Sequence, residues 1–174
     1  MDPRFARTKV AIHNAIIDLL RERNLSEITV SALCQRAGVN RNTFYAHYNN
    51  PTEVVEEISK EFMQEFDKIA TRQDKNLDIR VEVCRYLYEH RDVFSVLSST
   101  NAEQTYLKIA LAQAKKSTKT SLFYEQSDYL PPYYDEFIVG GCCFVLKEWI
   151  EKGAKESPEE IGLTIHKLFM KCKN

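Results

Sequence analysis

The sequence predicts an all-α protein of about nine helices, for two reasons. Apolar residues recur at helical spacing along most of the 174 residues. The one apolar run that could instead form a buried strand, residues 137–146, has no second strand to pair with. Hydrophobic residues make up 44% of the chain, which is enough to bury a core. A globular helical protein follows from these observations.

The first helix is predicted over residues 5–23, because apolar residues fall on one stripe and basic residues lie off it. Phe5 is the first member of that apolar stripe. Asn24 is expected to end the helix, because asparagine is second only to glycine in tolerating the left-handed conformation that a helix end often requires.

A helix-turn-helix is predicted directly after it. Thr29 is a suitable N-cap for a short second helix, which should stop at Gly38. Asn40 can cap a third helix, which leaves about three residues between the two. This spacing is typical of a helix-turn-helix, with Gly38 supplying the left-handed turn and Val39 pointing inward.

A long fourth helix, about residues 51–72, is predicted to connect this head to the rest of the chain. Asn50 can cap it, Pro51 suits its first turn, and Glu53 can reach back to the cap. Apolar spacing then predicts shorter helices near residues 79–87, 93–97 and 106–114. Residues 117–132 mix hydroxyls, aromatic rings and a Pro-Pro pair, so a loop or broken helix is expected there.

The C-terminal part is predicted to be an antiparallel helix hairpin. A wide apolar band from residue 137 ends near Gly153, and a capping box with proline in the first turn, Ser157 to Glu160, starts the last helix. Gly140 and Gly141 each cost about 1 kcal/mol inside a helix, so something should offset them. We favour close approach of a second copy, which makes a homodimer; a glycine pair in the monomer core or at a kink is the alternative. The expected interface residues are Ile138, Gly141, Cys142, Val145, Trp149, Ile161, Ile165 and Leu168.

The N-terminal and C-terminal parts of the chain carry net charges of opposite sign. The net charge is −1, which argues against indiscriminate binding of polyanions. Residues 1–50 nevertheless hold seven Lys and Arg against four Asp and Glu, whereas residues 51–174 hold 17 against 21. This modest asymmetry fits a DNA-binding head, residues 1–50, on a regulatory and dimerisation domain, residues 51–174.

Residues 2 to about 58 resemble the N-terminal DNA-binding domain of TetR-family transcriptional regulators. The resemblance is carried by ITV before the second helix, AGVNR in the turn and TFYAHY in the third helix. The C-terminal GG…W…G…SPEEI pattern is similar, more weakly, to the dimerisation hairpin of short family members. The resemblance implies a homodimer whose two recognition helices enter successive major grooves of a palindromic double-stranded DNA operator. It also implies repression, as a rule, with a small-molecule effector releasing the DNA.

Within this resemblance, the third helix carries the expected DNA contacts. Arg41, Asn42 and Thr43 lie in its first turn, from which side chains reach base edges or flanking phosphates; Arg41 suits guanine and Asn42 suits adenine. Phosphate contacts are implied for Thr43, Tyr45, His47 and Tyr48. Phe44 should point into the core. Tyr48 is equally suited to the core, and His47 could merely bridge to the fourth helix.

The sequence departs from the family at Pro51, where many members carry a lysine, so one charged phosphate contact is missing. Basic residues near the start of the first helix are expected to compensate. The remaining candidates for DNA contact are Arg7, Lys9 and Thr29.

Other functions receive little support. Weak candidates for lining an effector cavity are Tyr86, Phe94, Tyr106 and Phe137, although aromatic residues at helical spacing are core more often than pocket. Five cysteines and four histidines show no metal-ligand spacing and no catalytic motif, so no metal, cofactor or enzyme activity is expected. The longest nearly uncharged apolar run is too short for a membrane span and no signal segment is evident, so a cytoplasmic location is expected. A helical dimeric interaction module without DNA binding, or an activator of the same family, are the alternatives.

Overall fold

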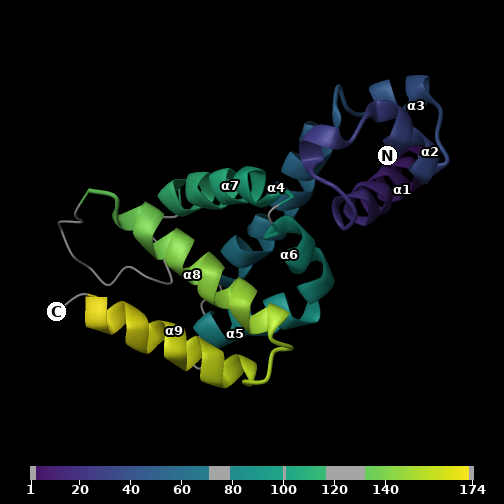
Figure 1. Ribbon diagram of the computed structural model, residues 1–174. Coiled ribbons are helices and arrows are strands. Elements are labelled where there is room, and N and C mark those ends of the chain that lie inside the picture. The colour runs from purple at the N-terminus through teal and green to yellow at the C-terminus, as the bar shows by residue number, and fades with distance from the viewer. Residues whose placement is uncertain (1–2, 71–78, 100, 117–131, 173–174) are drawn as a thin grey trace. The chain divides into compact units, whose positions relative to one another are not determined.

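The computed structural model describes residues 3–70, 79–99, 101–116 and 132–172 (Figure 1). These residues form nine α-helices and one 3-10 helix, and no strand occurs among them. The predicted all-α fold is therefore confirmed. No helix in the described part of the chain is both long and apolar enough to cross a membrane.

The chain folds as two compact units. The first contains residues 1–61 and 96–106, and the second contains residues 62–95 and 107–174. The units therefore differ from the predicted boundary at residue 50, because the start of the fourth helix and a later segment pack with the head. Asn101 anchors that later segment: its side-chain amide donates to the Leu20 carbonyl at 2.7 Å and its carbonyl accepts from the Leu25 N–H at 3.1 Å.

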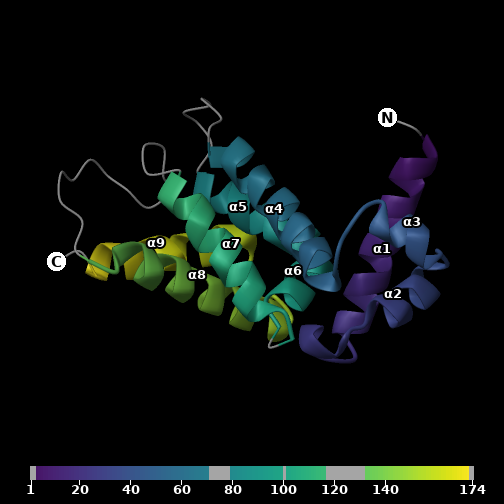
Figure 2. The ribbon, with the colours of Figure 1, turned by 90° about the horizontal axis from the view of Figure 1, so that it is seen from above.

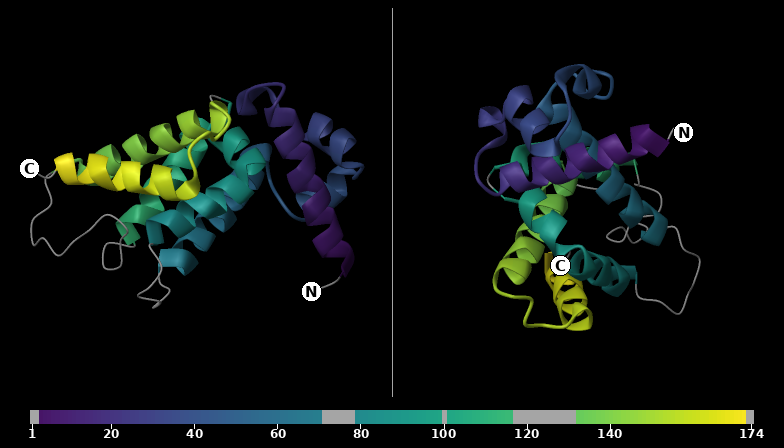
Figure 3. Two further views of the ribbon diagram at one scale, coloured as in Figure 1. Left: turned by 90° about the horizontal axis from the view of Figure 1, so that it is seen from below. Right: turned by 90° about the vertical axis from the view of Figure 1, so that its right-hand side faces the viewer.

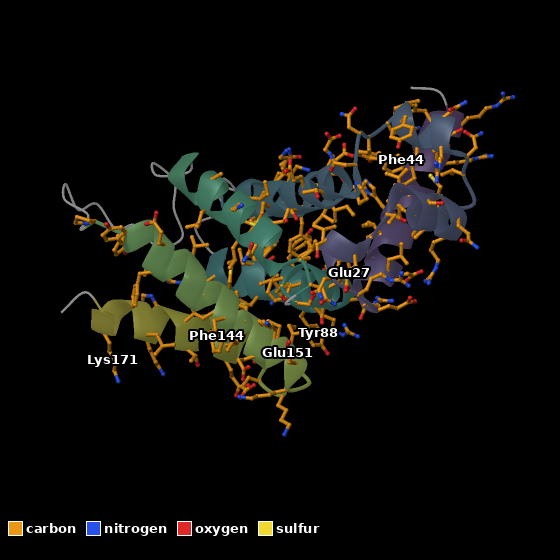
Figure 4. The ribbon with its side chains drawn as sticks, turned by 45° about the horizontal axis from the view of Figure 1, so that its top comes forward. Glu27, Phe44, Tyr88, Phe144, Glu151 and Lys171 are labelled. Atoms are coloured by element: carbon orange, nitrogen blue, oxygen red, sulfur yellow. The ribbon has the colours of Figure 1, made fainter. Side chains whose placement is uncertain are left out.

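The first unit is organised around a buried helix face. Figure 3 shows α2 (Val30–Ala37) and α3 (Arg41–Tyr45) lying beside α1 (Pro3–Leu20). Phe44 has no exposed surface and lies among the helices of this unit, as predicted (Figure 4). Other fully buried residues of the same unit include Ile12, Ile16, Leu33, Val54 and Val55.

The end of α1 corrects one sequence prediction. The helix stops at Leu20, three residues earlier than predicted, and Asn24 has φ −66° and ψ 150°, which is extended and not left-handed. Asn24 instead begins a 3-10 helix, η1 (Leu25–Glu27), and its N–H donates to the Glu27 carboxylate at 3.0 Å. The chain therefore turns directly into a new helical element and needs no left-handed residue.

The predicted cap of the fourth helix, α4 (Pro51–Ala70), is confirmed. The Asn50 side chain accepts from the Glu53 N–H at 3.1 Å, and Glu53 reaches back to the Asn49 N–H at 2.8 Å. Three helices follow, namely α5 (Ile79–Glu89), α6 (Arg91–Leu97) and α7 (Glu103–Lys116). The predicted loop at residues 117–132 lies almost wholly outside the described residues.

The second unit contains the predicted hairpin. Figures 1 and 2 show α8 (Tyr134–Glu151) and α9 (Pro158–Cys172) side by side. The capping box of α9 is complete: the Ser157 hydroxyl accepts from the Glu160 N–H at 3.2 Å, and the Glu160 carboxylate accepts from the Ser157 N–H at 2.8 Å. Helix α9 also packs closely on α5, because a Cβ added at Gly162 would lie 3.4 Å from the Val81 nitrogen.

Candidate nucleic-acid interface

The turn between α2 and α3 is fixed by local hydrogen bonds. The Thr29 hydroxyl accepts from the Ala32 N–H at 3.2 Å and caps α2. Gly38 ends α2 at φ 67°, a left-handed conformation that favours glycine. The Asn40 side chain then accepts from the Thr43 N–H at 2.7 Å and caps α3. The three capping predictions are confirmed, and together they hold a five-residue helix in place.

The side of α3 away from Phe44 is accessible. Arg41 and Asn42 are exposed, and Tyr45 keeps 56% of its surface exposed. A guanidinium and a carboxamide on the first helical turn have the donor and acceptor groups that read guanine and adenine in a major groove. The arrangement is thus suited to direct contact with a DNA duplex.

Two of the other residues predicted to contact DNA, Lys9 and Tyr48, instead interact with residues of the same protein. Lys9 pairs with Glu57 at 2.9 Å and with Glu61 at 2.7 Å, and the hydrogen bond that Lys9 donates to Glu61 is the largest cause of a raised Lys9 pKa. Tyr48 is only 7% exposed, so it belongs to the core of the unit, which was the alternative to a phosphate contact. The positive charge of Lys9 is largely offset and is less available for DNA than predicted.

The remaining predicted contacts lie nearer the surface. Arg7 is exposed on α1, and Thr43 is half-buried on α3. His47 is half-buried, and its ring stacks on Phe5 with the centroids 3.8 Å apart. Phe5 was predicted to lie on the buried stripe of the first helix, but 40% of it is exposed because it covers His47 near the start of α1.

A second surface lies on the hairpin. An apolar groove of about 210 Å³ is lined by six of the eight residues predicted for the dimer interface, together with Phe137. Among the described residues, a Cβ added at Gly140 or Gly141 would meet no atom within 4 Å beyond its own stretch of helix. Phe144 stands on α8 with 63% of its surface exposed (Figure 4). The six lining residues are Ile138, Gly141, Cys142, Val145, Ile165 and Leu168.

Trp149 and Ile161, the other two predicted interface residues, are buried within the protomer instead. Trp149 is 3% exposed, and its indole N–H donates to the Glu156 carbonyl at 3.0 Å. Its ring centroid lies 6.0 Å from that of Tyr88. The buried, hydrogen-bonded indole therefore stabilises the protomer. The apolar band of α8 is wide enough to face two directions, and Trp149 lies on the side that faces the protomer core.

Two of the four residues predicted to line an effector cavity, Tyr86 and Phe94, are ring neighbours of the same phenylalanine, Phe62. The ring centroids of Tyr86 and Phe62 are 5.2 Å apart, and those of Phe94 and Phe62 are 6.2 Å apart. Tyr106 is buried in the first unit, and Phe137 lines the groove of the hairpin.

Burial of Cys142 raises its pKa to about 12, so its thiol stays protonated and unreactive at neutral pH. Among the described residues, no group of three or more His, Cys, Asp and Glu could hold a metal ion.

Sequence reasoning missed a polar cluster in the first unit. His13 and Tyr48 are 2.9 Å apart, and the Tyr48 hydroxyl donates to Glu57. A usable signal was present, since Lys9 and His13 are spaced four residues apart on one helix and Glu57 and Glu61 are spaced four apart on another. Two such pairs of complementary chemistry can meet face to face when their helices pack.

The capped turn and the exposed first turn of α3 define a helix-turn-helix protein of the DNA-binding class. Comparison with known families agrees with that class. Residues 12–58 match the family described as "Bacterial regulatory proteins, tetR family", and residues 74–171 match "Transcriptional regulator C-terminal region". The chain belongs to the TetR family of transcriptional regulators, and the resemblance found in its sequence is confirmed.

Individual relatives are distant but share the fold. A protein from Listeria innocua, Lin0861, has a TM-score of 0.71 at 17% identity, covering 97% of this chain and 92% of its own. A TetR transcriptional regulator from Streptococcus agalactiae has a TM-score of 0.65 at 21% identity, covering 98% and 96%. The uncharacterized HTH-type transcriptional regulator YxbF of Bacillus subtilis is 20% identical in an alignment of 168 residues, and the match covers 90% of this chain and 43% of YxbF. The chain therefore spans less than half the length of that relative.

Proposed function

We propose that this regulator binds a palindromic double-stranded DNA operator as a homodimer in the cytoplasm, and that a small-molecule effector releases it to relieve repression. The observation that carries the proposal is the exposed first turn of α3, where Arg41 and Asn42 project from a helix capped at Asn40. An interaction module without DNA contact would not explain why polar side chains are held in the exposed first turn of a capped helix.

The hairpin supports the homodimer. Its groove is apolar, it lies between two helices, and the open space at Gly141 leaves room for the backbone of another helix. Exposed Phe137, Phe144 and Leu168 border or line this face, and their burial would stabilise a complex. Two-fold symmetry of the dimer would place two recognition helices on the two halves of a palindromic site.

Regulation by an effector is supported by the solved structure of a protein with a similar fold. SmeT, the repressor of a multidrug efflux pump of Stenotrophomonas maltophilia, has been solved as a complex with triclosan. That complex matches this chain with a TM-score of 0.63 at 18% identity, covering 95% of this chain and 90% of SmeT. The similarity shows a shared fold, and effector control of this chain is proposed by analogy with it.

Selection of bound duplexes from a random DNA pool tests the proposal. We expect a consensus with two-fold symmetry, and we expect the logarithm of affinity to fall steeply with the logarithm of salt concentration. Asn42→Ala should shift the selected bases, whereas Tyr45→Phe should weaken all selected sites to a similar degree. Failure to bind any duplex would favour the interaction module, and a reporter gene behind the selected site would distinguish repression from activation.

A further inference from the structure

A polar network inside the first unit joins three segments of the chain. Glu57 on α4 accepts from Lys9 of α1 at 2.9 Å through one carboxylate oxygen. Its other oxygen accepts from the hydroxyl of Tyr48, the third residue after α3, at 2.5 Å. His13 of α1 lies 2.9 Å from the same hydroxyl. Both oxygens of Glu57 are therefore held by groups from other segments.

The electrostatics of the network strengthen the bond between Tyr48 and Glu57. Burial tends to raise the pKa of Glu57, but the hydrogen bonds from Tyr48 and Lys9 outweigh burial, so its pKa lies below the ordinary value. Burial and the bond to Glu57 raise the pKa of Tyr48, so its hydroxyl keeps its proton. The bond therefore joins a neutral donor to an ionised acceptor, which is stronger than a bond between neutral groups.

The recognition helix needs such an external anchor. Helix α3 has five residues, and so short a helix does not hold its geometry through its own hydrogen bonds. Its start is fixed by the Asn40 cap, and its middle by burial of Phe44. Beyond its end, the Tyr48 hydroxyl donates to Glu57 of α4, and the N–H of the next residue, Asn49, donates to Glu53 of the same helix. Glu57 is therefore one of two α4 carboxylates that hold the segment after the recognition helix.

We propose that Glu57 is a positioning residue for DNA binding, which sets the orientation of the recognition helix without contacting DNA. This inference rests on the proposed DNA-binding function. When only a fraction of molecules holds the binding geometry, the apparent affinity falls in proportion to that fraction. Loss of the Glu57 anchor that leaves about one molecule in ten in that geometry would weaken operator binding about tenfold.

Glu57→Gln and Glu56→Gln form a matched pair for the test. Each removes one negative charge from the same turn of α4, but Glu56 accepts from Lys60 on its own helix and Glu57 joins three segments. With a selected operator duplex, Glu57→Gln should lose on the order of tenfold in affinity, while Glu56→Gln should not lose affinity. Equal affinities in the two variants, both folded by circular dichroism, would overturn the inference.

Tyr48→Phe tests whether the effect passes through the proposed hydrogen bond. It should weaken operator binding like Glu57→Gln, and the double variant should bind no more weakly than the weaker single variant. Losses that add in full would show that the two residues act separately, against the inference.

Amide hydrogen exchange gives a readout without DNA. Residues 41–48 should exchange faster in Glu57→Gln than in Glu56→Gln, because the anchored segment opens more often. Equal exchange would overturn the inference and leave the proposed function standing. Failure of the native protein to bind any duplex would instead overturn the proposed function, while the exchange comparison would still report on the anchor.

Discussion

Replacing Gly141 by alanine is expected to stabilise each protomer and to weaken the dimer. Within the part of the protomer that the structure describes, the added methyl group would meet no atom within 4 Å beyond its own stretch of helix, and Gly141 lies in the interior of α8. Alanine is favoured over glycine in a helix by about 1 kcal/mol. For a chain of this size, that gain raises the unfolding temperature of the protomer by roughly 2–4 °C.

In the dimer the same methyl group should have the opposite effect. Gly141 lines the groove of the hairpin, where the partner helix is proposed to approach closely. A methyl group forced into a packed contact costs about 1–3 kcal/mol, and it acts in both protomers. A total of about 2 kcal/mol or more corresponds to a dimer dissociation constant that rises about thirtyfold or more.

Sedimentation equilibrium measures the dimer dissociation constant, and thermal unfolding at concentrations below it measures the protomer. Gly140→Ala is the matched control, because its methyl group is equally unobstructed in the protomer but Gly140 does not line the groove. The control should gain thermal stability without losing dimer affinity. A Gly141→Ala protein that dimerises as tightly as the control would refute the interface proposed on α8 and α9.

Two further predictions concern polar groups of the first unit, of which His13 is half-buried and Ser59 is fully buried. Burial lowers the pKa of His13 below its ordinary value despite the nearby Glu57 and Glu61, with Lys9 and the Tyr48 hydroxyl also facing the ring. The unfolded chain then binds more protons, so the free energy of unfolding should fall as the pH drops from about 6.5 toward the lowered pKa. Urea unfolding across that range should show a shallower pH dependence for His13→Gln, and an unchanged slope would contradict this. Ser59 is fully buried, and within the described residues its hydroxyl has no hydrogen-bond partner. Ser59→Ala should therefore raise the free energy of unfolding by about 1 kcal/mol, and a decrease would show that the hydroxyl is satisfied.

The helix-turn-helix was predictable from the sequence because its chemistry is local. Thr29, Gly38 and Asn40 each bond to backbone groups within five residues along the chain, so their roles can be inferred from short stretches of sequence. The capping box at Ser157 was predictable for the same reason. Family resemblance added the DNA-binding function, which the local pattern alone does not specify.

Long-range pairing was not predictable in the same way. Lys9 and Glu57 are 48 residues apart, and a helical pattern indicates which side of a helix is polar but not which polar side it meets. Phe5 therefore seemed to be a core residue, although it covers His47 at the surface. The wide apolar band of α8 likewise does not indicate which of its residues are buried. Trp149 faces the core of the protomer, whereas Gly141 faces outward.

In the proposed dimer, Gly162 would have a consequence for the spacing of the proposed operator half-sites. Its missing side chain lets α9 rest against the backbone of α5 near Val81. A bulkier residue would lift α9 away, and Ile165 and Leu168 would travel with it, so two protomers joined through that helix would meet at a new angle. The number of base pairs between the half-sites that a regulator prefers could thus evolve through a residue that contacts neither the nucleic acid nor the other subunit.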